Sequence, residues 1–296
     1  MHPWVSDYYK NLFGTKVYKL SFDAGCTCPN RDGTKGTRGC IFCSEQGSGE
    51  FSVPFEDFQI PERFKGADTF IAYFQNYTNT YGNLKVLSKK WHKALTFDGI
   101  KGLAIATRPD CVGDDVILEL AKISEKHFVQ LELGLQTTNE KSAEYIRRGF
   151  SNADYFDAVA RVHKQAPGIH VVTHIIFGLP GETQEDMMNT VRAAVEAGTD
   201  GIKITCLYVL RGTDLATEYE QGKFEVLQMD EYFELLQKAL NIIPDSVIIH
   251  RLTGDPPKAT LIAPKWTEDK KRVMDAVKKL SFMNAKHVVP EPKRGS

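Results

Sequence analysis

"HVVTHIIFGLPGETQEDMMNTVRAAVEAG", residues 170–198, places an apolar run, a glycine-containing turn and an amphipathic stretch in direct succession. The run at 170–177 is almost continuously apolar, which is typical of a parallel strand covered on both faces. Thr183 and Asp186 have the spacing of a variant capping box, and Gly198 stands where a helix C′ residue is expected. The segment therefore predicts one strand–helix unit of a parallel sheet.

The same alternation recurs along the chain. Apolar runs predict six strands at residues 17–22, 69–74, 102–107, 128–135, 170–177 and 201–209. Helical stretches separate most of them, at residues 84–95, 114–126, 139–148, 152–164 and 184–197, with Ser151 placed as an N-cap. Six units are too few for a complete eight-fold barrel, so an open partial barrel and a doubly wound sheet both fit the pattern.

The pattern changes after about residue 210. A helix, a strand and a final helix are predicted at 229–243, 247–252 and 267–280. Thr267 is placed to cap the final helix, with acidic residues in its first turn and lysines late, as the helix dipole favours. The chain is thus divided into an N-terminal extension (1–16), a barrel (17–210), a C-terminal α/β layer (211–285) and a flexible tail (286–296).

Composition narrows the class of protein. The chain has 296 residues, 42% of them hydrophobic, and a formal net charge of −1. It contains no apolar stretch of the ~20 residues that span a bilayer, and its start lacks the pattern of a secretory signal. We therefore expect a cytoplasmic protein without membrane contact. Thiols stay reduced in that compartment, so clustered cysteines favour a metal site over disulfides.

Charge is unevenly distributed. Residues 258–296 carry ten Lys or Arg and four Asp or Glu, a surplus of six, which leaves the preceding 257 residues near −7. A basic segment on an acidic body suggests an anionic partner such as nucleic acid. The alternative is a solvated helix face followed by a frayed end.

Four of the six cysteines lie in "CTCPNRDGTKGTRGCIFC", residues 26–43, directly after the first predicted strand. That position is the C-terminal mouth of a βα barrel, where active sites are found. Four thiolates can hold a structural zinc ion, whereas three can hold a [4Fe–4S] cluster and leave one iron open for a ligand. The spacing of the cysteines alone does not separate these two interpretations.

The cysteine loop resembles the cluster loop of the radical SAM superfamily, in the long-spacing form of the Elongator catalytic subunit family. Further motifs extend the resemblance: FQNYTNTY (74–81), ATRPDC (106–111), ELGLQT (132–137), THIIFGLPGET (173–183) and HRLTGD (250–255). Together they are similar to the YhcC/YtqA-like group of bacterial radical SAM proteins, from about residue 3 to 284. The resemblance implies a partial (β/α)6 TIM-like barrel with a small appended C-terminal α/β layer.

The resemblance also implies the cofactors. The cluster ligands fall on Cys28, Cys40 and Cys43, and Cys26 becomes an additional thiol or a fourth ligand of a resting cluster. The open iron would bind S-adenosylmethionine, which is reductively cleaved to a 5′-deoxyadenosyl radical. A reducing partner such as flavodoxin or ferredoxin would supply the electron.

By the same resemblance, polar and small residues at the strand ends contact S-adenosylmethionine. These residues are Asn76, Thr78, Asn79, Thr107, Arg108, Glu132, Gln136, Arg148, His174 and Gly178. The turn at residues 76–79 departs from the GGE-like turn usual in the superfamily. The Gln-x11-Arg spacing of Gln136 and Arg148 is similar to that of the oxygen-independent coproporphyrinogen III dehydrogenases.

Structural alternatives exist for several of these residues. Arg108 is also placed to form an ion pair with Asp110, and Arg148 is also placed to answer the dipole at a helix C-terminus. Glu132 shares a strand face with Gln136 and would need either ribose hydroxyls or an arginine as partner. His174 is equally compatible with a hydrogen-bonded core histidine.

The C-terminal segment resembles the one that follows the radical domain in the Elongator catalytic family, which modifies wobble uridine in tRNA. The resemblance implies tRNA as substrate, with Arg251, Lys258, Lys265, Lys270, Lys271 and Arg272 as phosphate contacts that position the RNA. A radical enzyme acting on a small molecule or a protein is one alternative. A zinc-stabilised RNA-binding module without catalysis is the other.

Overall fold

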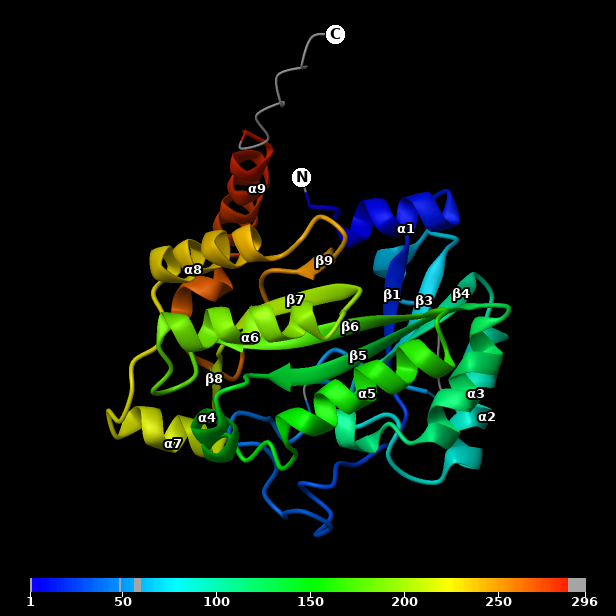
Figure 1. Cartoon of the computed structure of the whole chain (residues 1–296), viewed down its shortest axis with the longest axis horizontal. Coiled ribbons are helices and arrows are strands. Elements are labelled where there is room, and N and C mark those ends of the chain that lie inside the picture. The colour runs from blue at the N-terminus through cyan, green and yellow to red at the C-terminus, as the bar shows by residue number, and fades with distance from the viewer. Residues whose placement is uncertain (1, 48, 56–59, 287–296) are drawn as a thin grey trace, which may run out of the picture.

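The computed structural model describes residues 2–47, 49–55 and 60–286. Its centre is a curled parallel sheet with the strand order β2-β1-β3-β4-β5-β6-β7-β9 (Figure 1). The strands are β1 (Tyr18–Asp23), β2 (Val53–Pro54), β3 (Phe70–Phe74), β4 (Ile100–Thr107), β5 (Phe128–Gln136), β6 (Ile169–Phe177), β7 (Gly201–Cys206) and β9 (Ile248–Arg251). This open half-barrel confirms the partial-barrel prediction and excludes a doubly wound sheet.

Helices follow most of the strands, as the alternation predicted. They are α1 (Val5–Phe13), α2 (Leu84–Leu95), α3 (Asp114–Ser124), α4 (Glu140–Tyr145), α5 (Asn152–Gln165), α6 (Gln184–Glu196), α7 (Asp214–Glu220), α8 (Met229–Ile242) and α9 (Lys270–Lys286), with 3-10 turns η1 (Glu62–Phe64), η2 (Pro109–Cys111) and η3 (Lys265–Glu268). Complete capping boxes begin α5 at Ser151 and α6 at Thr183. No helix in the described ranges is both long and apolar enough to cross a membrane.

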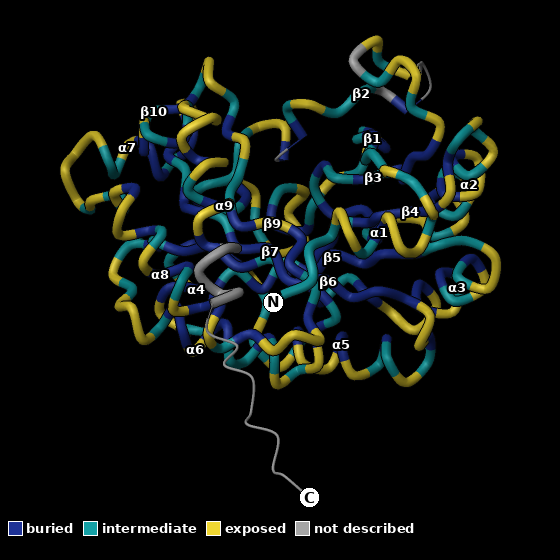
Figure 2. Tube along the Cα trace, turned by 90° about the horizontal axis from the view of Figure 1, so that it is seen from above, coloured by how far each residue is buried: buried dark blue, intermediate teal, exposed yellow. Residues whose placement is uncertain are grey.

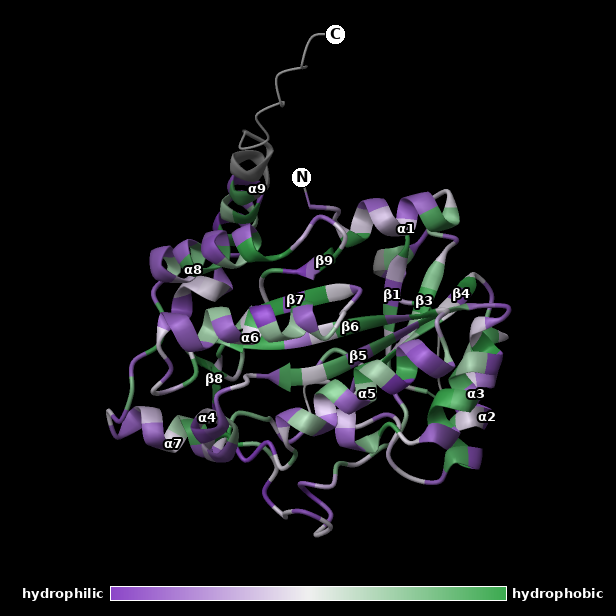
Figure 3. Cartoon of the chain, viewed as in Figure 1, coloured by the Kyte–Doolittle hydropathy of each residue, from purple (hydrophilic) through white to green (hydrophobic). Residues whose placement is uncertain are grey.

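The main hydrophobic core lies between the sheet and the helices on its outer side. Figure 2 shows the strands as mostly buried tubes inside an arc formed by α2, α3, α5, α6 and α8. In Figure 3 the middle strands are largely hydrophobic, whereas the outer helices alternate between hydrophilic and hydrophobic residues. Leu131, Ile175 and Ile204 on neighbouring strands are fully buried in this core. Burial on both faces explains why the strands appear in the sequence as continuous apolar runs.

The last predicted strands are arranged differently from expectation. The run at 201–209 is interrupted after Cys206, and Val209–Leu210 forms a separate strand, β8, which pairs antiparallel with β10 (Leu261–Ala263). The strand expected in the C-terminal layer is β9, and it pairs parallel with β7 in the barrel sheet. Its apolar residue Ile249 is fully buried there. By pairing with β7, β9 also covers a sheet edge that would otherwise be exposed.

The predicted cap of the final helix is wrong. Thr267 lies in η3, where its hydroxyl donates to the carbonyl oxygen of Pro264 at 2.7 Å. The helix α9 begins at Lys270, and Asp269 Oδ1 accepts from the backbone N–H of Arg272 at 3.0 Å. Threonine hydroxyls readily bond to nearby carbonyls in tight turns, and aspartate is the stronger N-cap residue. The acidic residues therefore precede the helix instead of occupying its first turn.

Candidate active site

A cavity of about 210 Å3 lies at the C-terminal ends of the barrel strands. Ten of the thirteen residues predicted to bind the cluster or its cofactor line it: Cys28, Cys40, Cys43, Thr78, Thr107, Arg108, Glu132, Gln136, Arg148 and His174. Arg251, predicted as an RNA contact, also lines it. Parallel strands end at one edge of the sheet, so residues separated by more than 200 positions meet there.

The three cysteines Cys28, Cys40 and Cys43 face this cavity together. Burial, together with the neighbouring thiols of Cys43 and Cys28, raises the pKa of Cys40 to about 12. Burial also raises the pKa of Cys43, while the guanidinium of Arg31 opposes the rise. Thiols that disfavour each other's ionisation are stabilised as thiolates by a bound metal. The donor set therefore fits a cluster with three cysteine ligands.

The arrangement fits a cluster better than a single zinc ion. In the described part of the chain, no three His, Cys, Asp or Glu side chains are arranged to hold one metal ion. The ligands of a [4Fe–4S] cluster bind different irons and do not need to converge on one point. A tetrahedral zinc site would instead require four side chains around one centre.

Cys26 is separated from the other three cysteines of the loop. It packs against the main hydrophobic core and is not among the residues lining the cavity. Burial raises the pKa of its thiol to about 11, and its charged neighbours are Lys90 and Asp23. The structure therefore offers no support for Cys26 as a fourth ligand.

Asn30 connects the cysteine loop to the segment after β5. This side chain is 4% exposed, and its Nδ2 lies 2.7 Å from the carbonyl oxygen of Arg147 and 3.1 Å from that of Arg148. The same nitrogen lies 3.5 Å from Cys40 Sγ. Gly149, at a φ of 74°, passes so close that a Cβ there would lie 2.5 Å from Asn30 Oδ1. This amide therefore holds the Cys40 thiol in place against the segment after β5.

We expect Asn30→Ala to weaken binding of the cluster about tenfold and so to lower the iron retained per chain. The loss of a group that orients a metal ligand typically lowers metal affinity by at least about this factor. Iron and sulfide analysis after oxygen-free reconstitution measures the change. Asn11→Ala, at an exposed position of α1, is the matched control. Iron content equal to that of the wild type would show that the Asn30 amide does not support the cluster.

Arg108 is held by a buried ion pair. It is 8% exposed, and its Nε and Nη2 donate to the two carboxylate oxygens of Asp110 at 2.9 Å each. Lys35 from the cysteine loop contacts the same carboxylate at 2.6 Å. The pairing with Asp110 is thus present, but in the interior and not on the surface. Its role is to fasten the cysteine loop to the end of β4.

Arg148 is almost entirely engaged by the protein. It is 1% exposed, and its Nη1 donates to the carbonyl oxygens of Leu135 and Thr137 at 3.2 and 2.5 Å. Its Nε donates to Phe150 O and its Nη2 to Asn152 Oδ1, each at 3.0 Å. These bonds use four of the five N–H groups of a guanidinium. Arg148 therefore positions the segment after β5 and has one N–H left for a ligand.

Gln136 and Tyr77 line the cavity in a strained backbone conformation. Their φ angles are 61° and 57°, in the left-handed region that residues other than glycine rarely adopt. When its amide donates, Gln136 Nε2 lies 3.0 Å from the carbonyl oxygens of Gly134 and Leu135. A Cβ at Gly134 would lie 2.3 Å from this amide, so a larger residue there would displace the Gln136 side chain from its present position. Strain of this kind concentrates at functional sites.

Asn76, Asn79 and Gly178 are not among the residues that line the cavity. Asn79 Nδ2 donates to the carbonyl oxygens of Phe74 and Ala106 at 3.0 Å each, which closes the turn after β3. Asn76 is 3% exposed, and its Oδ1 has no hydrogen-bond partner among the described residues. Gly178, at a φ of 86°, packs against the side chain of Leu227.

Glu132 lies deeper in the cavity, between two lysines. Its carboxylate lies 2.9 Å from Lys19 Nζ, accepts from Tyr73 OH at 2.7 Å, and forms a further ion pair with Lys203. Burial disfavours its charge, but Lys19 and Lys203 outweigh burial and hold the pKa of Glu132 well below its usual range. The sequence analysis expected ribose hydroxyls or an arginine as the partner of this carboxylate. In the structure its charged partners are two lysines.

Lys19, Tyr73 and Lys203 are site residues that the sequence analysis missed. The two lysines interrupt the apolar runs "VYKLSF" and "GIKITC". A charged residue in a strand buried on both faces requires a partner, so these interruptions were an available signal. Burial lowers the pKa of Lys203 to about 7, against the opposing effect of Glu132.

His174 also faces the cavity, and it is neutral. Its Nε2 lies 2.9 Å from Thr205 Oγ1 on the neighbouring strand. Burial and the charge of Lys203 together lower the pKa of His174 to about 4. A neutral imidazole beside a hydroxyl can orient a ligand without adding charge.

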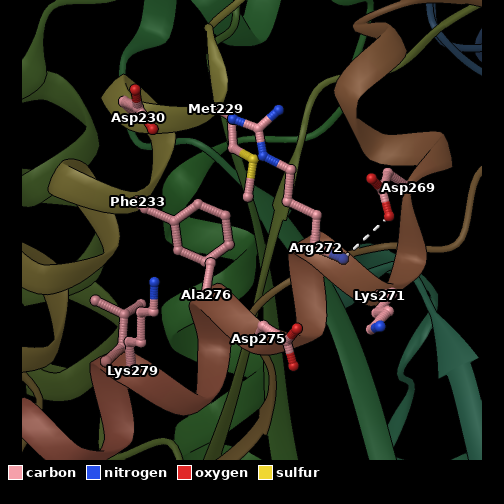
Figure 4. A pocket seen from close by; sticks show the side chains of 10 residues that line it. Met229, Asp230, Phe233, Asp269, Lys271, Arg272, Asp275, Ala276 and Lys279 are labelled. Carbon is pink, nitrogen blue, oxygen red and sulfur yellow. Dashed lines mark hydrogen bonds between the residues drawn. The ribbon is translucent and has the colours of Figure 1, made fainter.

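The basic C-terminal residues other than Arg251 lie outside this cavity. Lys271 and Arg272 line a separate open groove of about 610 Å3 between α8 and α9, where Asp269 accepts from the Arg272 backbone (Figure 4). The groove has three basic and three acidic lining residues: Lys271, Arg272, Lys279, Asp230, Asp269 and Asp275. The remaining predicted contacts are partly paired or exposed: Lys265 with Glu268, Lys270 with Asp255, and Lys258 on the surface.

Comparisons with known proteins agree with this geometry. Residues 32–194 match the family model described as the radical SAM superfamily, and residues 199–281 match the radical SAM C-terminal domain. The uncharacterised protein YtqA of Bacillus subtilis is 42% identical over 277 residues, which cover 90% of this chain and 85% of YtqA.

Two more distant proteins are similar to part of this chain. A tRNA-2-methylthio-N(6)-dimethylallyladenosine synthase of Leifsonia xyli is 29% identical over 60% of this chain and 33% of that protein. The structure of the archaeal Methanocaldococcus infernus Elp3 superposes with a TM-score of 0.58 and 21% identity, over 72% of this chain and 55% of that one. The second likeness supports the half-barrel fold.

Proposed function

Because this chain belongs to the radical SAM superfamily, whose members use a [4Fe–4S] cluster and S-adenosylmethionine, we propose that it is an enzyme that modifies wobble uridine in tRNA. When bound, the cluster and cofactor supply a 5′-deoxyadenosyl radical that removes a hydrogen atom from an unactivated C–H bond. The observation that carries the proposal is the cavity that Cys28, Cys40 and Cys43 line together.

The chain's own residues would hold and orient these groups. Cys28, Cys40 and Cys43 would be the cluster ligands, with Asn30 and Arg31 donating hydrogen bonds around them. The walls offer polar groups to S-adenosylmethionine from the strand ends: Thr78, Thr107, Gln136 and His174. Residues of six strands and of the cysteine loop wall the cavity, and such an enclosure would limit the access of water to a reactive species.

Three features support tRNA as the substrate. A distant relative that shares the radical domain is named as a tRNA-modifying synthase. The motifs of the C-terminal segment resemble those of the Elongator catalytic family, and this resemblance favours the wobble uridine. The basic residues of η3 and α9 would contact phosphates that position the RNA, while Arg251 reaches the cavity itself.

One observation favours a second candidate, a radical enzyme that acts on a small molecule or a protein. The groove between α8 and α9 balances three basic with three acidic residues, whereas RNA-binding surfaces are strongly positive. Either enzyme would take its electron from a reduced partner such as flavodoxin or ferredoxin.

Nucleoside mass spectrometry of tRNA separates the two candidates. In cells without the gene we expect one modified wobble uridine to disappear or to be replaced by its precursor. Wild-type protein and Cys26→Ala should restore the profile, whereas Cys40→Ala should not. An unchanged profile in the deletion strain would remove tRNA as the substrate.

A further inference from the structure

The walls of the cavity carry an excess of positive charge. Five basic side chains and one carboxylate line it: Arg31, Arg108, Arg148, Lys203, Arg251 and Glu132. Asp110 neutralises Arg108. A cluster held by three thiolates carries a net negative charge and S-adenosylmethionine a net positive one, so together they leave the surplus nearly unchanged. The site therefore has unmatched positive charge after both cofactors are bound.

Two of these basic side chains, Lys203 and Arg251, lie in one row with the neutral His174 across three neighbouring strands. The sheet register pairs His174 of β6 with Lys203 of β7, and Lys203 with Arg251 of β9. Directly paired residues lie side by side on one face of a sheet. Lys203 is buried three residues before the end of β7, whereas Arg251 is the last residue of β9 and its side chain is 42% exposed, so the pair runs from the cavity wall toward its opening.

The row also has donors that the protein does not use. The Lys203 ammonium has three N–H groups, one bound to Glu132 and one 3.4 Å from the hydroxyl of Tyr73. Arg251 donates from Nη2 to Asp255 at 2.8 Å, and the described part of the chain shows no other hydrogen bond of its guanidinium. An arginine fork beside an ammonium is suited to a carboxylate or a phosphate.

We propose that Lys203 and Arg251 bind an anionic group of the substrate, a carboxylate or a phosphate, inside this cavity. The inference deepens the proposed function and rests on the substrate entering the cavity. The carboxylate of S-adenosylmethionine does not satisfy this pair, because it belongs on the open iron beside the cysteines. The pair thus selects for substrates that carry negative charge near the reacting carbon.

Binding of two simple anions to the loaded enzyme tests this assignment. Acetate and inorganic phosphate are titrated calorimetrically, at constant ionic strength, into protein reconstituted with its cluster and saturated with S-adenosylmethionine. We expect one of them to bind at least about tenfold more weakly to Lys203→Met and to Arg251→Met than to the wild type, because each variant loses a charge-assisted hydrogen bond. Lys10→Met, on the exposed face of α1, should bind as the wild type does.

Affinity for acetate should also fall as the pH rises through about 7, where Lys203 loses its proton. Phosphate does not serve for this measurement, because its own charge changes in the same range. The groups that face this ammonium are Lys19, Tyr73, Glu132, His174 and Arg251. Of these, Glu132 keeps its charge because its pKa is lowered, Lys19 and Tyr73 keep their protons because their pKa values are raised, and His174 stays neutral, so the decline reports on Lys203. The anion that binds more tightly identifies the substrate group as carboxylate or phosphate.

Two results would overturn the assignment. Equal affinity of wild type and Lys203→Met would show that the pair binds no anion. Binding of the anion to reconstituted protein without S-adenosylmethionine, but not to the saturated protein, would assign the site to the cofactor. Failure of the proposed function is distinguishable, because an unchanged tRNA profile in the deletion strain would leave the measured anion binding intact.

Discussion

Cys40→Ala is expected to leave the protein without a stable iron–sulfur cluster and to lower cleavage of S-adenosylmethionine by more than about 100-fold, since even groups behind metal ligands cost 10–100-fold. Cys40 lies close enough to both other cavity cysteines for each of them to raise its pKa. The substitution would leave only two cysteines to hold the cluster. The loss should be visible as missing colour in oxygen-free preparations.

Cys26→Ala is the matched control for this prediction, because it removes a thiol from the same loop that packs against the core. It should retain wild-type iron content and the wild-type rate of 5′-deoxyadenosine formation, which chromatography measures. Equal loss in the two variants would mean that all four cysteines bind the metal, as a zinc site requires. Full activity of Cys40→Ala would remove the assigned cluster ligands altogether.

Glu132→Leu is expected to lower the free energy of unfolding by about 3 kcal/mol, because removing one partner of a buried ion pair leaves uncompensated charge. The variant strands the ammonium groups of Lys19 and Lys203, both of which contact this carboxylate. Urea unfolding measures the change. Glu234→Leu, an exposed glutamate of α8, should change stability by less than about 0.5 kcal/mol.

A double-mutant cycle sharpens this prediction. Glu132→Leu combined with Lys203→Met should be more stable than the sum of the single changes predicts, because the second substitution removes one of the stranded charges. Strict additivity would show that Glu132 and Lys203 do not interact in solution. A Glu132→Leu variant as stable as the control would mean that the carboxylate is not needed to keep the lysines buried.

The pH dependence of stability follows from the same network. The folded-state pKa of Glu132 is depressed, so its contribution is complete above its ordinary value of 4.5 and is lost as the pH falls through the lower folded value. The pKa of Lys203 is also depressed, to about 7 from 10.5, so the unfolded chain binds more protons between these values. The free energy of unfolding should therefore rise as the pH increases from about 7 to 10.5, and Lys203→Met should flatten this rise.

Much of the architecture followed from local patterns. Continuous apolar runs marked the barrel strands, and the capping boxes at Ser151 and Thr183 begin helices where expected. The spacing of Cys28, Cys40 and Cys43 after the first strand placed them at the mouth of the barrel. These features depend on residues close in the chain, because strand period, helix caps and loop spacing are set by neighbours.

The interior of the site depended on the order of the strands. Lys19, Glu132 and Lys203 lie on β1, β5 and β7, and no local pattern in the sequence relates them. Likewise, Arg251 faces the cavity because β9 joins the barrel sheet instead of a separate layer. The sequence by itself thus determined most of the barrel strands and helices and the position of the cysteine loop at the barrel mouth. The tertiary structure alone decided which buried charges meet, because ion pairs between distant strands form only when the sheet curls around them.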